Sequence, residues 1–185
     1  MTVPVASFGK SPYEGKLVRL RAREPEDEAA YYRWLNDPAV TEHLAVRCPA
    51  SHLFEREFLQ ADKGPSYFNA GFGVETLAEG KLIGSTSLHA ASPENRSAQV
   101  GIFIGDTACW DGGYGTDTMR TICRFGFEMM NLHRIELEVY APNARARRVY
   151  EKVGFHTEAC RRKARYQNGQ YLDVVVMGLL EGELR

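Results

Sequence analysis

The chain contains 185 residues, carries a formal net charge of −1 and has 25% charged residues. This length favours one domain with a sizeable hydrophobic core, and the near-neutral charge argues against direct nucleic-acid binding. The four cysteines lack the paired spacing of a metal site, so we expect no metal and a reducing, cytoplasmic location. We expect no membrane association, because no apolar run approaches the roughly 20 residues of a membrane span and the N-terminus does not resemble a signal peptide.

The N-terminal part of the chain predicts a lead-in, a strand and the start of a helix. Residues 1–15 contain Gly, Pro and Ser and predict a loose lead-in, so residues 16–185 form the single predicted domain. Residues 16–21 alternate between polar and apolar side chains, which is typical of a strand. The acidic residues of segment 25–28 favour a helix start, because they lie near the positive end of the helix dipole.

Helical spacing marks one face on each of two expected helices. In the first helix, the apolar face continues through Ala29, Tyr32 and Leu35. The second helix is predicted over residues 51–62, where four side chains fall at helical spacing: Leu53, Phe54, Glu57 and Phe58. Two strands follow, over residues 67–76 and 81–89, and a four-residue hairpin turn joins them.

The central stretch predicts a strand, a glycine-rich turn and a long helix. The strand covers residues 99–104 and closes at Gly105. The turn, residues 110–116, contains three glycines, which permit positive φ and let backbone amides approach a ligand. The helix after the turn has one continuous apolar face, made of Met119, Ile122, Cys123, Gly126, Phe127 and Met130.

The glycine turn and the helix N-terminus together predict an anion-binding site. Unpaired amides and the positive end of the helix dipole point the same way at such a junction. The turn does not complete a dinucleotide fingerprint, because Thr118 stands where the third glycine would be. It also lacks the Lys-Ser/Thr pair of a mononucleotide P-loop, so a nucleotide-phosphate binder is a disfavoured alternative.

The C-terminal part predicts a strand, a short helix and a final pair of strands. The strand covers residues 133–140, and Asn143 then caps a helix that ends at Gly154. The last strands cover residues 156–162 and 171–179, with a turn at residues 167–169 between them. The whole order, βααβββαβαββ, predicts an α/β (α+β) fold with a mixed, mostly antiparallel central sheet flanked by helices on both sides.

Two motifs in this order carry a resemblance. The run from Asn143 to Phe155, placed after a strand and after Trp110…Gly113-Tyr114-Gly115, resembles the GNAT superfamily of N-acetyltransferases. Within that superfamily the chain is similar to the branch of ribosomal-protein N-terminal and polyamine acetyltransferases. The resemblance covers about residues 17–180, and it implies the GNAT fold with acetyl-CoA as co-substrate.

The resemblance also implies which residues bind the cofactor. The pyrophosphate of coenzyme A would lie on the amides of Asp111, Gly112, Gly113, Tyr114, Gly115 and Thr116. The pantetheine arm would pair with the strand around Phe103 and Ile104 and contact Asn143, and Arg148 would approach the phosphates. Family members commonly have a basic residue near the position of Asp111, whose carboxylate is unfavourable beside a pyrophosphate unless it points away or caps the helix.

Acetyl transfer from a thioester to an amine requires a neutral amine, a site for the oxyanion and a proton for the leaving thiolate. The resemblance implies that Tyr150 is the general acid and Glu138 the general base. Alternation with Leu137 and Val139 places Glu138 on the opposite face of its strand. The alternatives are a packing role for Tyr150, an ordinary exposed carboxylate at Glu138 with a water chain as base, and a structural role for lone histidines such as His89.

The resemblance implies an acetyl-CoA-dependent N-acetyltransferase that acts on a primary amine. A protein N-terminus is the favoured acceptor, and a polyamine or a small-molecule amine such as an antibiotic is the alternative. A catalytically silent acyl-CoA-binding regulator is a further alternative, because Asp111 stands in the glycine turn and Ala146 replaces a serine that is common in the family. Both a monomer and a homodimer are compatible with the sequence.

Overall fold

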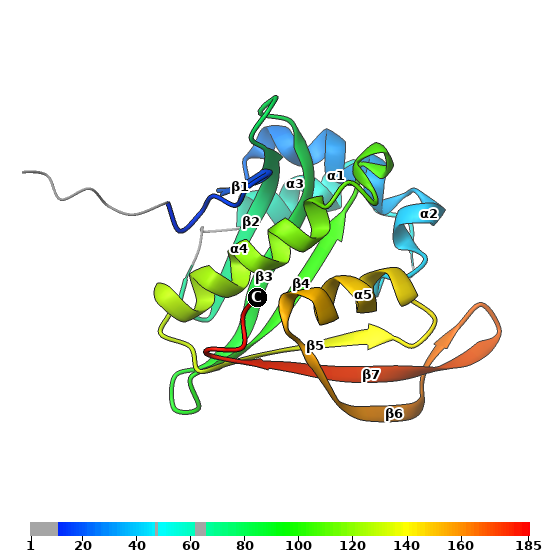
Figure 1. Ribbon diagram of the computed structural model, residues 1–185. Coiled ribbons are helices and arrows are strands. Elements are labelled where there is room, and N and C mark those ends of the chain that lie inside the picture. The colour runs from blue at the N-terminus through cyan, green and yellow to red at the C-terminus, as the bar shows by residue number, and fades with distance from the viewer. Residues whose placement is uncertain (1–10, 47, 62–65) are drawn as a thin grey trace, which may run out of the picture.

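The computed structural model describes residues 11–46, 48–61 and 66–185, and its fold is shown in Figure 1. These residues form one seven-stranded sheet in the order β1-β2-β3-β4-β5-β7-β6. Neighbouring strands are antiparallel, except that β4 and β5 are parallel. The strands are β1 (Val18–Arg21), β2 (Asn69–Thr76), β3 (Leu82–Ser92), β4 (Ser97–Ile104), β5 (Arg134–Tyr140), β6 (His156–Gln167) and β7 (Gln170–Leu180).

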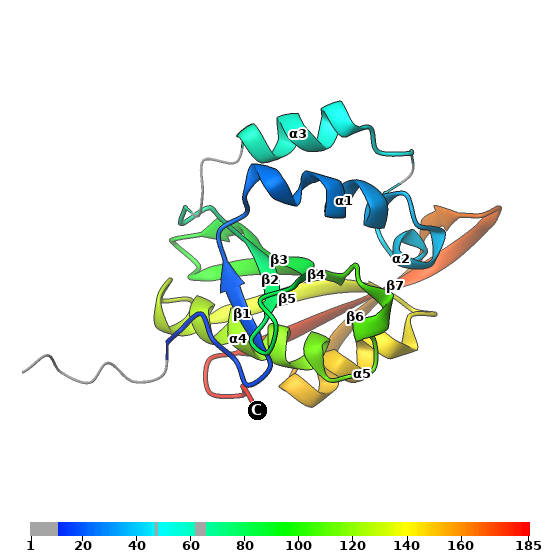
Figure 2. The same ribbon diagram turned by 90° about the horizontal axis from the view of Figure 1, so that it is seen from above.

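Helices cover both faces of this sheet. In Figure 2, α4 and α5 lie on one face, while α1 and α3 lie on the other. The helices are α1 (Glu28–Leu35), α2 (Pro38–Thr41), α3 (His52–Ala61), α4 (Tyr114–Glu128) and α5 (Ala144–Val153). The predicted mixed, mostly antiparallel sheet with helices on both sides is confirmed, and the four-residue helix α2 is an addition to the predicted order.

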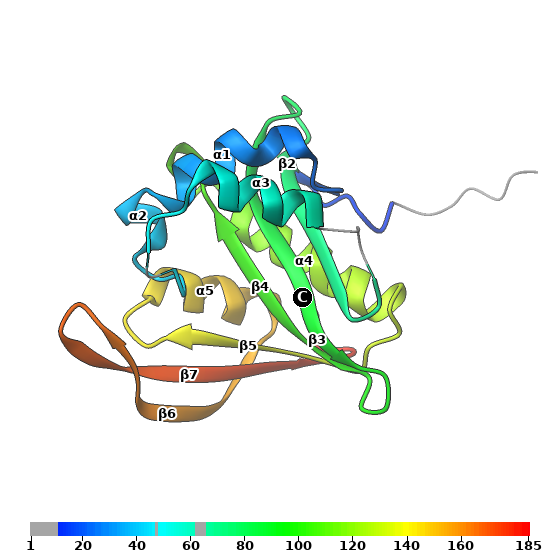
Figure 3. The same ribbon diagram turned by 180° about the vertical axis from the view of Figure 1, so that it is seen from behind.

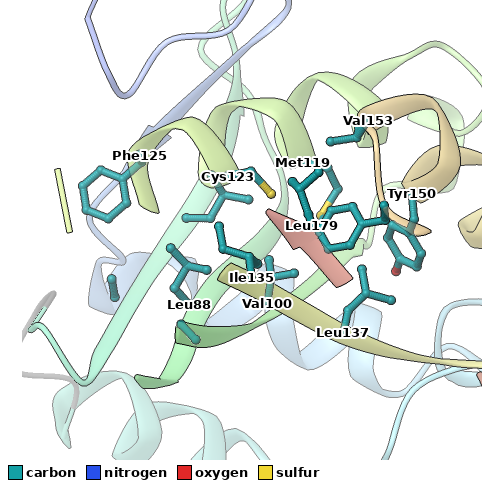
Figure 4. Packing of buried hydrophobic residues seen from close by; sticks show 14 of the residues in the cluster. Leu88, Val100, Met119, Cys123, Phe125, Ile135, Leu137, Tyr150, Val153 and Leu179 are labelled. Carbon is teal, nitrogen blue, oxygen red and sulfur yellow. The ribbon is translucent and has the colours of Figure 1, made fainter. Parts of the chain in front are cut away.

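The main core lies between the sheet and the helices α4 and α5. Figure 4 shows Met119 and Cys123 of α4 among side chains from the sheet, and both are fully buried. Gly126 has a packing reason to be glycine, because an added Cβ would lie 2.9 Å from both Leu88 and Ile135. The predicted apolar face of this helix, including the buried thiol, is therefore confirmed.

β4 and β5 pair along only part of their length. Their parallel register covers three residue pairs, which join residues 97–99 of β4 to residues 134–136 of β5. Beyond these pairs the two strands diverge, as Figure 3 shows. The remainder of β4, residues 100–104, stays paired with β3 on one side and has an open backbone edge on the other.

The predicted face of the first helix is wrong. In α1 the buried side chains are Tyr31 and Trp34, whereas Ala29 is exposed. The two aromatic rings pack edge-on against each other, with centroids 5.8 Å apart, and each also meets Phe103 of β4. Large aromatic side chains gain more from burial than alanine does, so they set the rotation of the helix.

The predicted second helix is confirmed as α3, but the side chains whose helical spacing indicated it are exposed. The buried positions of this helix are instead Glu55 and Leu59. A further difference concerns β6, which continues to Gln167 rather than ending at residue 162. Asn168 and Gly169 both have positive φ, so a two-residue turn closes a longer hairpin than the sequence predicted.

The glycine turn is fixed to the sheet by a buried carboxylate. Asp117, in the first turn of α4, accepts hydrogen bonds from the backbone amides of Lys16, Leu17 and Val18 at 2.7–3.1 Å. A carboxylate is also favourable there because of the helix dipole. The start of β1 and the start of α4 are therefore held together.

The predicted lead-in, residues 1–15, is described only from residue 11 onward. In that part, Arg124 of α4 donates a hydrogen bond to the Glu14 carbonyl at 2.6 Å, and the ring of Tyr13 lies 5.6 Å from that of Phe125. Residues 11–15 therefore pack along α4, while residues 1–10 lie outside the described residues.

Candidate active site

A cavity of about 760 Å³ opens where β4 and β5 diverge. The starts of α4 and α5 border it, as do side chains of α1 and α3 from the opposite face of the sheet. Most of the site residues predicted from the sequence line this cavity: Phe103, Ile104, Asp111, Gly113, Gly115, Thr116, Glu138, Asn143, Arg148 and Tyr150. Gly112 and Tyr114 are not among the lining residues, and Tyr114 packs against the main core.

The open edge of β4 offers backbone groups in alternation. The Gly105 amide donates to the Ile83 carbonyl of β3 at 2.8 Å, which fixes the phase of the antiparallel pairing. Alternate residues of a strand direct their backbone N–H and C=O groups to the same neighbouring strand. The backbone groups of Phe103 therefore point to β3, whereas those of Ile102 and Ile104 point to the open side. An added extended chain would therefore pair with Ile102 and Ile104, while Phe103 contributes its side chain.

Trp110 closes one end of this edge. Its indole Nε1 donates a hydrogen bond to the Ile104 carbonyl at 2.8 Å, so the Ile104 N–H is the group of that residue that an added chain can use. The guanidinium of Arg145 lies over the indole ring, 3.7 Å from its centroid. Arg145 and Arg148 of α5 both line the cavity and bring positive charge to this end of it.

The glycine turn presents amides to the cavity. Gly113 is the N-cap of α4 and has a φ of 87°, which a residue with a side chain rarely adopts. The first amides of α4 have no partner within the helix, and the positive end of the dipole lies at the same place. At Gly115 an added Cβ would find Ile104 Cγ1 as its nearest neighbour, at 4.0 Å, so the space above this glycine is open. The turn therefore fits a phosphate-bearing ligand that approaches the backbone closely.

Asp111 does not cap α4. Its φ is 60°, its side chain is exposed, and no side chain makes the N-cap hydrogen bond of this helix. The residue nevertheless lines the cavity. A carboxylate therefore stands at the cavity near a position where family members commonly have a basic residue.

Asn143 caps α5 through its side chain, as the sequence predicts. Its Oδ1 accepts a hydrogen bond from the Ala146 amide at 3.1 Å. Because the same side chain borders the cavity, contact with a bound cofactor stays a prediction that the cap does not preclude.

Tyr150 places a phenol between the core and the cavity. The side chain is 9% exposed, its ring lies 6.1 Å from that of Phe155, and Figure 4 shows its phenolic oxygen pointing away from Val153. Its phenolic oxygen forms no hydrogen bond with the other described residues and is not fully shielded, so it is accessible from the cavity. Burial raises the pKa of Tyr150 to about 12. The group therefore stays protonated at neutral pH and can act as an acid.

Glu138 lines the same cavity from β5. The side chain is about half exposed and forms an ion pair with Arg161 of the neighbouring hairpin. Leu137 and Val139 on either side of it are buried, which confirms that Glu138 lies on the opposite face of the strand.

Several polar residues that line the cavity were missed from the sequence: Tyr31 of α1, Glu55 of α3 and Ser87 of β3. His89 of β3, which the sequence analysis weighed as a lone histidine, also lines it. The Ser87 Oγ lies 3.4 Å from the His89 Nδ1, and burial lowers the pKa of His89. These residues belong to no motif, so only the packing of the two layers brings them together.

Two further properties concern the described residues as a whole. They contain no group of three or more His, Cys, Asp or Glu side chains placed to hold a metal ion. Among the helices formed by these residues, none is long and apolar enough to cross a membrane.

The comparisons with known proteins agree with the geometry of this site. A family model described as an acetyltransferase (GNAT) domain matches residues 18–156. The chain belongs to the GNAT acetyltransferase family. YdaF of Bacillus subtilis, named as a proposed ribosomal N-acetyltransferase, is 33% identical over 138 residues, which cover 73% of this chain and 74% of that protein.

A second relative has both a sequence and a structural match. The spermidine N(1)-acetyltransferase of Vibrio cholerae is 30% identical over 141 residues, which cover 72% of this chain and 80% of that protein. A crystal structure of spermidine N-acetyltransferase from the same organism, in complex with CoA and spermine, superimposes with a TM-score of 0.80 at 25% identity. The superposition covers 90% of this GNAT chain and 96% of that one. This GNAT protein is an acetyl-CoA-dependent N-acetyltransferase that modifies an amine.

Replacing Gly115 with alanine separates cofactor binding from stability. The new methyl group has room within the protein, so the free energy of unfolding should change by no more than about 1 kcal/mol. The same methyl group enters the space above the α4 amides, so we expect the Kd for coenzyme A, measured by titration calorimetry, to rise at least about tenfold.

Gly126→Ala is the matched control, because its methyl group would meet Leu88 and Ile135 in the core instead of the cavity. It should lower stability and leave the Kd for coenzyme A within about twofold. Unchanged coenzyme A affinity in a well-folded Gly115→Ala protein would contradict the placement of the cofactor on this turn.

Proposed function

We propose that this GNAT enzyme acetylates the primary amine of a protein N-terminus, with Tyr150 as general acid and Glu138 as general base. The observation that carries the catalytic assignment is the phenol of Tyr150, which is buried, protonated and without a hydrogen-bond partner in the described residues, at the cavity where β4 opens. The name of YdaF and the resemblance to the ribosomal branch support the acceptor class. The spermidine-acetylating relative favours a polyamine as the second candidate.

The open edge and the glycine turn would hold acetyl-CoA. The backbone of Ile102 and the N–H of Ile104 would pair with its extended arm, and the amides at the start of α4 would bind its phosphates. Arg145 and Arg148 would add positive charge near those phosphates. When bound, acetyl-CoA supplies the activated acetyl group as a thioester.

The acceptor amine must lose a proton before it can attack. Glu138 is half exposed at the cavity and would accept this proton at a carboxylate oxygen, directly or through one water. As the new C–N bond forms, the Ile104 N–H would donate a hydrogen bond to the acetyl oxygen.

The leaving sulfur must gain a proton as the C–S bond breaks. Tyr150 would donate it from its phenolic oxygen, which carries its proton at neutral pH. Attack by the neutral amine leaves one further proton on the nitrogen, which would pass through water to the phenolate of Tyr150, while the proton taken up by Glu138 returns to solvent. The cycle then releases the amide, the free thiol and one proton, and the protein ends it unchanged.

Tyr150→Phe tests the acid. We expect kcat to fall by about 100-fold or more, which is within the range for loss of a general acid. Stability should change by less than about 1 kcal/mol, because the phenol has no hydrogen-bond partner in the described residues. The measurement is the release of free thiol from acetyl-CoA, with peptides of varied N-termini, polyamines and aminoglycosides offered in turn as acceptors.

The matched control is Tyr171→Phe, which removes an exposed phenol from the β6–β7 hairpin. It should retain wild-type turnover. We expect the wild type to turn over peptides and Tyr150→Phe to lose this activity. Full activity of Tyr150→Phe would rule out Tyr150 as the acid. Wild-type turnover confined to polyamines would replace a protein N-terminus by a polyamine as the acceptor.

Glu138→Gln tests the base. At neutral pH we expect kcat/KM to fall by about 100-fold, and the deficit should shrink as the pH rises toward the pKa of the acceptor amine, because more acceptor is then already neutral. Glu136→Gln, which removes the carboxylate two residues earlier on the same face of β5, should behave as wild type. A deficit that stays constant with pH would mean that Glu138 serves another role.

A further inference from the structure

Helix α3 turns a carboxylate inward and its apolar side chains outward. Glu55 is 2% exposed, whereas Leu53, Phe54 and Phe58 are 63%, 60% and 49% exposed. This is the reverse of the usual pattern for a helix packed on a protein core. Violations of this kind concentrate at functional sites, where another requirement overrides packing.

One oxygen of the Glu55 carboxylate is buried without compensation from the described residues around it. In the described part of the chain its Oε1 is inaccessible and has no hydrogen-bond partner. Burial, and then the charge of Glu28 on α1, raise the pKa of Glu55. The interaction between the two carboxylates is repulsive because their charges are alike, and Glu28 itself contacts His52.

The nearby cation has other contacts. Arg23 also lines the cavity, but its guanidinium lies over the ring of Phe58, 5.6 Å from the centroid, and against Gly71 of β2. Its charge is not among the causes that shift the pKa of Glu55. Among the described residues, the Glu55 carboxylate therefore faces the cavity without an ion-pair partner.

An uncompensated buried carboxylate is unfavourable until a cation pairs with it. Glu55 lines the same cavity as Tyr150 and Glu138, so a ligand in the cavity can supply that cation. The buried phenol of Tyr31, which lies near Ser85, adds a second polar group at the same cavity.

We propose that Glu55 is a specificity-determining residue that binds a second, positively charged group of the acceptor, apart from the amine that is acetylated. This inference rests on the proposed function, because it concerns the acceptor end of the same cavity. The required chemistry is a second ammonium group on the acceptor molecule. A diamine has it, and so does a peptide with lysine next to its N-terminus.

Matched acceptors test this requirement and distinguish the two sources. The first pair is 1,4-diaminobutane and butylamine, and the second is a peptide with lysine at position 2 and the same peptide with norleucine there. In Glu55→Gln, the KM for the doubly cationic member that the wild type prefers should rise at least about tenfold, while kcat stays within about threefold. The KM for its singly charged partner should not change.

Glu57→Gln is the matched control, because it removes a carboxylate from the exposed face of the same helix. It should leave all four KM values within about twofold of wild type. Equal losses on charged and uncharged acceptors in Glu55→Gln, or no loss on either, would overturn the proposal.

A binding measurement keeps this inference separate from the proposed function. Titration calorimetry with 1,4-diaminobutane and with the lysine peptide needs no turnover, and the wild type should bind one of them at least about tenfold more tightly than Glu55→Gln does. Without amine, Glu55→Gln should have a higher Tm than wild type, because the unpaired charge is gone.

The two failures give different results. If the wild type turns over no amine but binds a doubly cationic probe through Glu55, the proposed function fails and the cation site stands. If turnover is normal and neither probe distinguishes wild type from Glu55→Gln, the proposed function stands and the role of Glu55 is overturned.

Discussion

The early separation of β4 and β5 is the constraint on which the rest of the site depends. The two strands pair at three positions and then diverge, so the backbone of Ile102 and the N–H of Ile104 have no strand to pair with. An unpaired edge inside a sheet is normally avoided, because each group left without a partner is unfavourable once it is shielded from water. Here the gap creates the cavity, and the starts of α4 and α5 flank it, so one feature places an extended-chain site, an anion site and the candidate acid together.

Two buried polar side chains line this cavity. Burial raises the pKa of Tyr150, whose phenol carries the proton that an acid donates. Burial also raises the pKa of Glu55, one oxygen of which has no partner among the described residues, so this carboxylate would favour a ligand that brings a cation. A buried polar atom without a partner does not favour the stability of the protein alone. Glu138 differs from both, because its side chain is half exposed and forms an ion pair with Arg161.

Local patterns in the sequence predicted the strand, the glycine turn and the long helix of the central stretch, because apolar periodicity and glycine conformation are properties of short segments. The cap at Asn143 was predictable for the same reason. The inward carboxylate of Glu55 was not, because helical spacing shows which residues share a face but not which face meets the sheet. The roles of Ile102 and Phe103 on the open edge depend on the register with β3, and register is set by pairing between distant segments.

Amide hydrogen exchange measured residue by residue, with and without coenzyme A, tests the central claim most directly. Cofactor pairing along the open edge should slow exchange at Ile102 and Ile104, and at the first amides of α4, while Phe103 changes little because its amide already faces β3. Protection that skips Ile102 and Ile104, or that appears instead along the exposed strand β6, would contradict the account.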